Sequence, residues 1–303
     1  MVSLLTVIKF PASAAIFPFS PAALLRAKGP DAHTFLQGQF TNDLSKVSPG
    51  KSVYGLWLDR KGKVIADSTV VQGAGGQEFF IASIASPGPA IALHLGGHII
   101  ADDVEIADET GAWRGISLVG AGSGAWLTGG PRAGLAFPGR RDSGENWEWV
   151  FAEADAAAAG EAVAGARILN AADMERMRIN SGIPSVPADI GPSDLPNEGG
   201  LDRDAISYSK GCYLGQEVMA RIKSLGRVRR TLVRVRGTCA PPALPAGLWL
   251  GDRREGEVRS AVSDSGGFAG LALVSVAAAA GGGGGPLSLA PGAAGVVEIV
   301  SNP

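Results

Sequence analysis

The sequence predicts an α+β protein made of a larger body and a small C-terminal β-barrel. The chain has 303 residues, which is enough for about two domains. Strand-like and helix-like segments alternate at short range up to about residue 226. Beyond Gly226 the chain consists of short β-like pieces separated by glycine and proline, a pattern typical of small barrels. We therefore place the body at 20–226 and the barrel at 227–303.

The elements of the body follow from periodicity and turn residues. Residues 24–29 form a short apolar–polar strand, and Pro30 with Asp31 suits the first turn of a helix over 32–40. Two β-like runs, 52–58 and 64–71, flank a turn in which Gly62 can adopt a positive φ, so we expect a hairpin. Further elements are predicted as strands at 77–84, 99–108 and 113–120 and as a helix at 87–98.

The second part of the body is less regular. Residues 120–146 are rich in glycine, proline and arginine with little periodicity, and we expect a surface excursion there. Helices are predicted over 153–166 and 170–178. Residues 182–200 contain four prolines and no periodicity, and a loop of this length within a domain is usually functional or disordered.

The C-terminal part begins with a clear strand. In VRRTLVRVRG the valines alternate with arginines, which predicts a strand with one face in water. The run of alanines and glycines at 277–286 is predicted to be a flexible insertion.

Composition disfavours several classes of protein. The formal net charge is −2, whereas dedicated nucleic-acid binders are basic, so a nucleic-acid partner is not expected. Two cysteines cannot staple a scaffold, and an iron–sulfur cluster normally needs about four thiolates. We find no uncharged apolar stretch of the ~18 residues that a membrane span requires. The first 17 residues lack a basic start, so we expect a short extension or first strand and a cytoplasmic protein.

The segment 210–221, KGCYLGQEVMAR, concentrates residue types that carry chemistry, and we call it the signature segment. Gly211 and Gly215 permit tight backbone geometry. Cys212 lies between a lysine and a helix-like stretch whose N-terminus can lower the pKa of a thiol. From the residues alone, Cys212 is either such a reactive thiol or a small buried cysteine without reactivity.

The signature segment closely resembles that of the YgfZ-type folate-binding proteins, relatives of the glycine-cleavage T-protein, an aminomethyltransferase. The similarity extends in the same order over most of residues 23–236. It includes GPDAHTFLQGQFTNDL at 29–44, LDRKGKVIAD at 58–67, RINSGIPSVPADI at 178–190 and LPNEGGLD at 195–202.

The resemblance implies a T-protein-like folate-binding body of two interleaved α/β parts around a central channel, followed by a β-barrel. It implies that the chain binds tetrahydrofolate or a one-carbon derivative. It further implies an accessory role in iron–sulfur cluster assembly or repair, with client or assembly proteins as partners. Among the clients would be radical enzymes that modify tRNA.

Two departures from the T-protein bear on whether the chain is an enzyme. The T-protein hairpin carries a pair of aspartates needed for aminomethyl transfer, and the matching positions here are Ala66 and Asp67. Where the T-protein has a pterin-binding glutamate, this chain has Asn180, which can hydrogen-bond a pterin edge but carries no charge. Both changes count against transfer, so a folate-dependent aminomethyl or one-carbon transferase, with Asp67 as acid or base, is the alternative hypothesis.

Several further side chains are predicted to face the ligand, each with a plainer alternative. Asn42 and Asp43 are pocket residues or a helix-capping turn. Trp57 stacks on a pterin or packs in the core. Glu198 reaches the pocket or is an exposed loop carboxylate. Basic residues at 221–236 bind the glutamate tail of a folate, contact RNA, or form a solvated face, with Arg221 and Arg227 the best candidates for the tail. The remaining predicted ligand-binding residues are Arg178, Lys210, Tyr213, Gln216 and Glu217.

Overall fold

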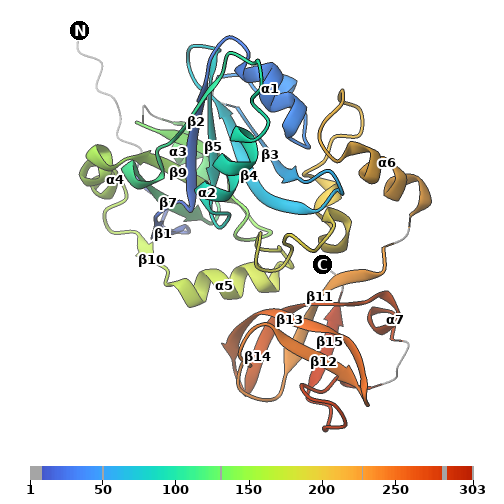
Figure 1. Cartoon of the computed structure of the whole chain (residues 1–303). Coiled ribbons are helices and arrows are strands. Elements are labelled where there is room, and N and C mark those ends of the chain that lie inside the picture. The colour runs from blue at the N-terminus through green and yellow to red at the C-terminus, as the bar shows by residue number, and fades with distance from the viewer. Residues whose placement is uncertain (1–8, 50, 130–131, 227, 282–284, 302–303) are drawn as a thin grey trace.

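The computed structural model describes residues 9–49, 51–129, 132–226, 228–281 and 285–301. Two five-stranded sheets form the body, and a third forms the C-terminal part (Figure 1). The α+β architecture predicted from the sequence is therefore confirmed.

The first sheet is antiparallel and contains the predicted hairpin. Its strand order is β3 (Ser52–Leu58), β4 (Val64–Gln72), β5 (Glu78–Ser83), β2 (Ala23–Lys28) and β6 (Glu105–Asp108). Gly62 has a φ of 73° in the turn between β3 and β4, as expected. Helices α1 (Ala32–Gln39) and α2 (Gly88–Gly96) cover one face, where they share a core with Trp57, Val70 and Ile81. The strand predicted over 99–108 is confined to β6.

The second sheet faces the opposite side of the first. Its order is β10 (Arg167–Ile168), β1 (Ala15–Phe19), β7 (Trp113–Val119), β9 (Asn146–Ala152) and β8 (Leu135–Pro138), with β1 and β10 the parallel pair. Phe137 and Val150 pack against Leu24, Val71 and Ala82 of the first sheet, so the two sheets share a core. Helices α3 (Ser123–Thr128) and α4 (Ala156–Ala162) lie on the outer face, where Trp126, Leu127, Ala159 and Val163 pack.

The expectation of a surface excursion at 120–146 was wrong. This stretch contributes α3 and β8 to the second sheet, and Trp126 of α3 is only 2% exposed. The stretch shows little periodicity because α3 and β8 are short and are separated by glycine and proline.

The third sheet is a curled half-barrel. Its order is β12 (Ala246–Leu250), β13 (Arg253–Asp264), β14 (Gly267–Ser275), β11 (Arg230–Gly237) and β15 (Val297–Ser301). Isolated bridges from Leu287 to Val297 and from Ser288 to Trp249 link its two edges. A short helix, α7 (Val276–Ala279), follows β14. Helix α6 (Gln216–Leu225) precedes β11, and we keep the division at 226/227 as a proposal.

Helix α5 (Ala171–Asn180) lies between the body and the third sheet (Figure 1). Asn170 begins it with a capping box in which Asp173 takes part. The proline-rich loop (182–200) follows α5, and its buried Val186 and Ile190 share a core with Leu271 and Leu273 of β14. This core places one wall of the body against the half-barrel.

Candidate functional site

A cavity of about 220 Å³ lies between the two sheets of the body. One side of the cavity is formed by strands β4 and β5. A second side is formed by the end of β8 and the residues that follow it. The third is formed by α5 and the start of the proline-rich loop. Its charged and phenolic lining residues are Tyr54, Asp67, Arg140, Arg141, Glu175 and Arg178. Apolar walls with a few polar groups that converge are the usual composition of a small-molecule site.

Asp67 of β4 is one of two acids that line this cavity, the other being Glu175 of α5. Its carboxylate accepts hydrogen bonds from the hydroxyls of Tyr54 at 3.0 Å, Ser83 at 2.9 Å and Ser86 at 2.6 Å. Burial raises the pKa of the carboxyl, and the three hydroxyls and Arg140 oppose this only in part. A carboxylate offers about four acceptor sites. Three are used by these hydroxyls, so Asp67 retains the capacity to accept one further N–H from a ligand.

The neighbouring Ala66 does not face the cavity. Successive residues of a strand point to opposite faces. Asp67 therefore shares a face with Val71, and Ala66 packs in the helix-covered core with Trp57 and Val70. An aspartate at position 66 would therefore point into the core. Having alanine there does not remove a carboxylate from the cavity.

Two arginines enter the cavity from the residues that follow β8. The guanidinium carbon of Arg140 lies 3.9 Å from the centroid of the Tyr54 ring, and Arg140 forms an ion pair with Asp204. Arg141 pairs with the buried Glu148 at 3.0 Å. Burial raises the pKa of Glu148, although Arg141 and Ser117 oppose the increase. The cavity thus has two guanidinium groups among its lining residues, each paired with a carboxylate.

Arg178 connects the cavity to the half-barrel. It donates to Asp189 at 2.6 Å, to Ser260 of β13 at 2.8 Å and to the carbonyl oxygen of Ile183 at 2.6 Å. It also pairs with Glu175 in the preceding turn of α5. Asp189 in turn accepts from Ser260 at 2.6 Å. Because these bonds use its donors, Arg178 is held in one position at the base of the cavity.

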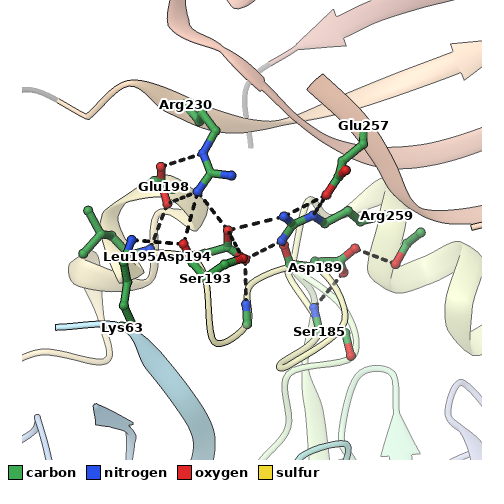
Figure 2. Close-up of polar contacts among 12 residues, drawn as sticks. Lys63, Ser185, Asp189, Ser193, Asp194, Leu195, Glu198, Arg230, Glu257 and Arg259 are labelled. Carbon is green, nitrogen blue, oxygen red and sulfur yellow. Dashed lines mark hydrogen bonds and ion pairs between the residues drawn. The ribbon is translucent and has the colours of Figure 1, made fainter. Parts of the chain in front are cut away.

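The proline-rich loop carries three buried acids, Asp189, Asp194 and Glu198, and we call their contacts with the half-barrel the joint. Figure 2 shows Arg230 between Glu198 and Asp194, and Arg259 between Asp194 and Glu257. Burial opposes the charge on Asp194, but Arg259, the Gly191 N–H and Arg230 outweigh it and lower the pKa. Glu198, predicted to be either a pocket residue or an exposed carboxylate, is neither, because it is buried in the joint.

The signature segment lies against the end of α1. The ammonium of Lys210 donates to the carbonyl oxygens of Gln37 at 2.7 Å, Phe40 at 2.6 Å and Asn42 at 3.0 Å. Burial lowers the pKa of Lys210 to about 8, so it is mostly charged at neutral pH. Gly215 begins α6 beside the hairpin turn, where a Cβ would lie 2.9 Å from the carbonyl oxygen of Asp59. Lys210 and Gly215 thus have a structural role in fixing the segment.

Cys212 is exposed, which argues against the alternative of a buried cysteine. Tyr213, next to it, is buried, and its hydroxyl has no hydrogen-bond partner within the described residues. Burial raises the pKa of Tyr213. Among the described residues, no group of three or more His, Cys, Asp or Glu could hold a metal ion.

Of the site residues predicted from the sequence, the candidate acid or base Asp67 and the predicted ligand-binding residue Arg178 line the cavity. Trp57 is fully buried in the core, where its indole N–H donates to Ser68 at 2.9 Å. Asn42 and Asp43 form the turn after α1: Asn42 donates to the carbonyls of Tyr54 and Asp204, and Asp43 accepts from Ser45 and Gln37. The predicted residues that lie elsewhere, outside the cavity lining, are Asn180, Gln216, Glu217 and Arg221. Arg227 lies outside the described residues.

Sequence reasoning missed Tyr54, Ser83, Ser86, Arg140 and Arg141. Tyr54 and the two serines carry a usable signal, since strand alternation places Tyr54 and Ser83 on defined faces of β3 and β5. The arginines belong to the stretch 120–146, in which neither strand nor helix was expected.

Residues 9–130 match the family model described as the GCVT N-terminal domain. The iron–sulfur cluster assembly factor IBA57 homolog of Phaeosphaeria nodorum, named as mitochondrial, is 31% identical over 240 residues, which cover 73% of this chain and 55% of the relative. Human IBA57, also named as mitochondrial, is 28% identical over 242 residues, covering 73% and 66%. The tRNA-modifying protein YgfZ of Edwardsiella ictaluri is 28% identical over 270 residues, covering 78% and 77%. The chain thus spans about half to two thirds of the two IBA57 relatives.

The fold is that of the glycine-cleavage aminomethyltransferases. The crystal structure of aminomethyltransferase T from Bartonella henselae superposes with a TM-score of 0.72 at 19% identity, over 90% of this chain and 81% of that one. Together with the sequence matches, this makes the chain a YgfZ-type relative of aminomethyltransferase, which confirms the resemblance seen in the signature segment. Within the described residues, no helix is both long and apolar enough to cross a membrane.

Proposed function

We propose that the chain binds tetrahydrofolate or a one-carbon derivative in the cavity and acts as an accessory protein in iron–sulfur cluster assembly or repair. Folate binding is proposed from Asp67, whose carboxylate is held by three hydroxyls in a cavity that Arg140 and Arg141 also line. A pterin ring presents N–H donors that suit a carboxylate, and a folate ends in carboxylates that suit arginine. When bound, the folate would supply a carrier for one-carbon groups.

The size of the cavity also bears on this proposal. At about 220 Å³ it is smaller than the ~300–1,000 Å³ typical of sites that enclose a whole drug-sized ligand. In this proposal a bicyclic ring would lie beside Asp67, and the rest of a folate would have to extend outside. Asp67 would accept from the ring, and Arg178 would keep the base of the cavity in place.

The relatives support the accessory role. Two are named as iron–sulfur cluster assembly factors and one as a tRNA-modifying protein. Client or assembly proteins of iron–sulfur enzymes, including radical enzymes that modify tRNA, are therefore the proposed partners. The exposed Cys212 is the thiol that would meet them. The cytoplasmic location stays a prediction, since two relatives are named as mitochondrial.

Calorimetric titration with tetrahydrofolate under reducing, anaerobic conditions tests the folate proposal. We expect saturable binding that Asp67→Asn weakens about 10–100-fold, because a hydrogen bond to a charged group contributes about 1.5–3 kcal/mol. Asp252→Asn, a change at an exposed acid of the half-barrel, should leave the affinity unchanged. No binding at millimolar ligand, or equal affinity in Asp67→Asn, would contradict a folate site at Asp67.

Because Ala66 does not face the cavity, the transferase hypothesis remains the alternative. Since Ala66 faces the core, the one acid that faces the cavity from this strand, Asp67, is still present. Tetrahydrofolate-dependent turnover of an aminomethyl donor, abolished in Asp67→Asn, would make the chain an enzyme. Folate binding without such turnover would support the accessory role.

A further inference from the structure

A second hollow, which we call the outer groove, lies on the other side of Tyr54 from the cavity. Tyr54 lines both hollows, and its hydroxyl donates to Asp67 in the cavity. The groove measures about 680 Å³ and is more open than the cavity. Tyr54 is therefore the partition between a small inner space and a large outer one.

Arg140 and Asp204 complete this partition. Arg140 lines the cavity, covers the Tyr54 ring and reaches Asp204, which lines the groove. The side chain of Arg140 is 25% exposed, whereas that of Asp204 is 52% exposed. The Arg140 guanidinium is thus mostly enclosed between the two hollows, whereas the Asp204 carboxylate lies at the rim of the groove, where solvent reaches it.

The groove beyond the partition is suited to negative charge. Lys46, Arg203 and Lys223 line it, together with hydroxyls of Ser207, Tyr208 and Ser209. Its acidic lining residue is Asp204, which Arg140 already pairs. A ligand whose ring fills the cavity and whose carboxylate tail extends past Tyr54 and Arg140 would therefore meet cations in the groove.

We propose that Arg140 is the docking group for the carboxylate tail of the ligand, and that Asp204 occupies the place of that carboxylate in the empty protein. This inference rests on the proposed function, because it assumes that the ring of a folate occupies the cavity. Guanidinium–carboxylate pairs have the same fork geometry whether the carboxylate belongs to a side chain or to a ligand. Binding would then exchange one anion for another at Arg140, while the stacking of Arg140 on Tyr54 is kept.

The exchange predicts that one substitution strengthens ligand binding. Removing the charge of Asp204 takes away the internal competitor, so an anionic ligand should bind more tightly rather than less. Asp204→Asn is a mild change, because the side chain is half exposed and the hydrogen bond from Asn42 goes to the backbone carbonyl. Asp202→Asn is the matched control, since Asp202 is two residues away and neither lines the groove nor pairs with Arg140.

The experiment compares two ligands, tetrahydrofolate and 6-methyltetrahydropterin, which has the ring but no carboxylate tail. We expect Asp204→Asn to tighten tetrahydrofolate about 10-fold and to leave the tail-less pterin unchanged. Arg140→Gln should weaken tetrahydrofolate at least 10-fold, toward the affinity of the tail-less pterin. Asp202→Asn should change tetrahydrofolate affinity by less than about 2-fold.

The outcomes separate the two proposals. If neither ligand binds the wild-type protein, the proposed function fails and this inference fails with it. If both ligands bind and Asp204→Asn tightens neither, the folate site stands and the exchange at Arg140 is overturned. The exchange is likewise overturned if Arg140→Gln weakens both ligands equally, and this second variant keeps the test decisive should Asp204→Asn not fold.

Discussion

The cavity and the signature segment both contain charged side chains removed from water, but the partners of these charges differ. In the cavity, Asp67 is held by side-chain hydroxyls, and Arg140 is paired with an acid on the rim. In the signature segment, Lys210 donates to three main-chain carbonyls at the end of α1. A side chain can rotate away and release its partner, whereas a carbonyl at a helix end stays in place.

This difference separates the proposed binding region from a supporting one. The polar groups of the cavity can exchange partners with a ligand at modest cost, because rim groups such as Asp204 regain water when they are displaced. The contacts of Lys210 cannot be exchanged without leaving carbonyls unpaired. The most conspicuous motif of the sequence therefore holds the end of α1 in place and presents Cys212, while the proposed ligand site is formed by less conspicuous residues.

The largest effect on stability is expected from a substitution at the base of the cavity. Arg178→Met should lower the free energy of unfolding by about 3–5 kcal/mol, because it leaves the buried Asp189 without its cation. Arg176→Met is the control on the same helix. Its side chain is 38% exposed and pairs with the equally exposed Asp173, so we expect a loss below about 1 kcal/mol. Urea denaturation measures both, and equal losses would show that the buried Arg178–Asp189 pair contributes no more than a surface ion pair.

A smaller effect is expected from breaking the support of the signature segment. Lys210→Met should lower the free energy of unfolding by about 2–3 kcal/mol, since the carbonyls of Gln37, Phe40 and Asn42 lose their donor. The tetrahydrofolate affinity of the folded variant should stay within about 2-fold of wild type, because Lys210 does not line the cavity. Lys61→Met, at an exposed position of the hairpin turn, is the control. A large loss of affinity in Lys210→Met would mean that the two regions act as one site.

Local patterns in the sequence were sufficient to predict much of the fold. The strand β11 follows from its alternation of valine and arginine, and the hairpin β3–β4 follows from two β-like runs with Gly62 in the turn between them. Asp67 could be predicted because it lies within that hairpin. Helix α5 could be predicted because its first turn carries capping residues and good helix formers.

The cavity as a whole could not be predicted, because it is assembled over long distances in the sequence. Arg140 meets Tyr54 and Asp204 only when the two sheets face one another, and nothing local to Arg140 indicates either contact. The signature segment shows the opposite difficulty. Its density of special residues was evident, but a lysine that binds a ligand and a lysine that binds carbonyls have the same sequence pattern.

The smallest effect on stability, and the sharpest test of the division between the two regions, concerns Cys212. Because its side chain is exposed, Cys212→Ser should change the free energy of unfolding by less than about 0.5 kcal/mol and leave tetrahydrofolate affinity unchanged. The activity of client iron–sulfur enzymes in cells that depend on the variant should nevertheless fall, if the segment presents this thiol to a partner. Cys239→Ser, at a half-buried cysteine that packs against the half-barrel core, should leave client activity intact. Full client activity in Cys212→Ser would remove the thiol from the mechanism and leave the cavity as the part of the molecule that carries the function.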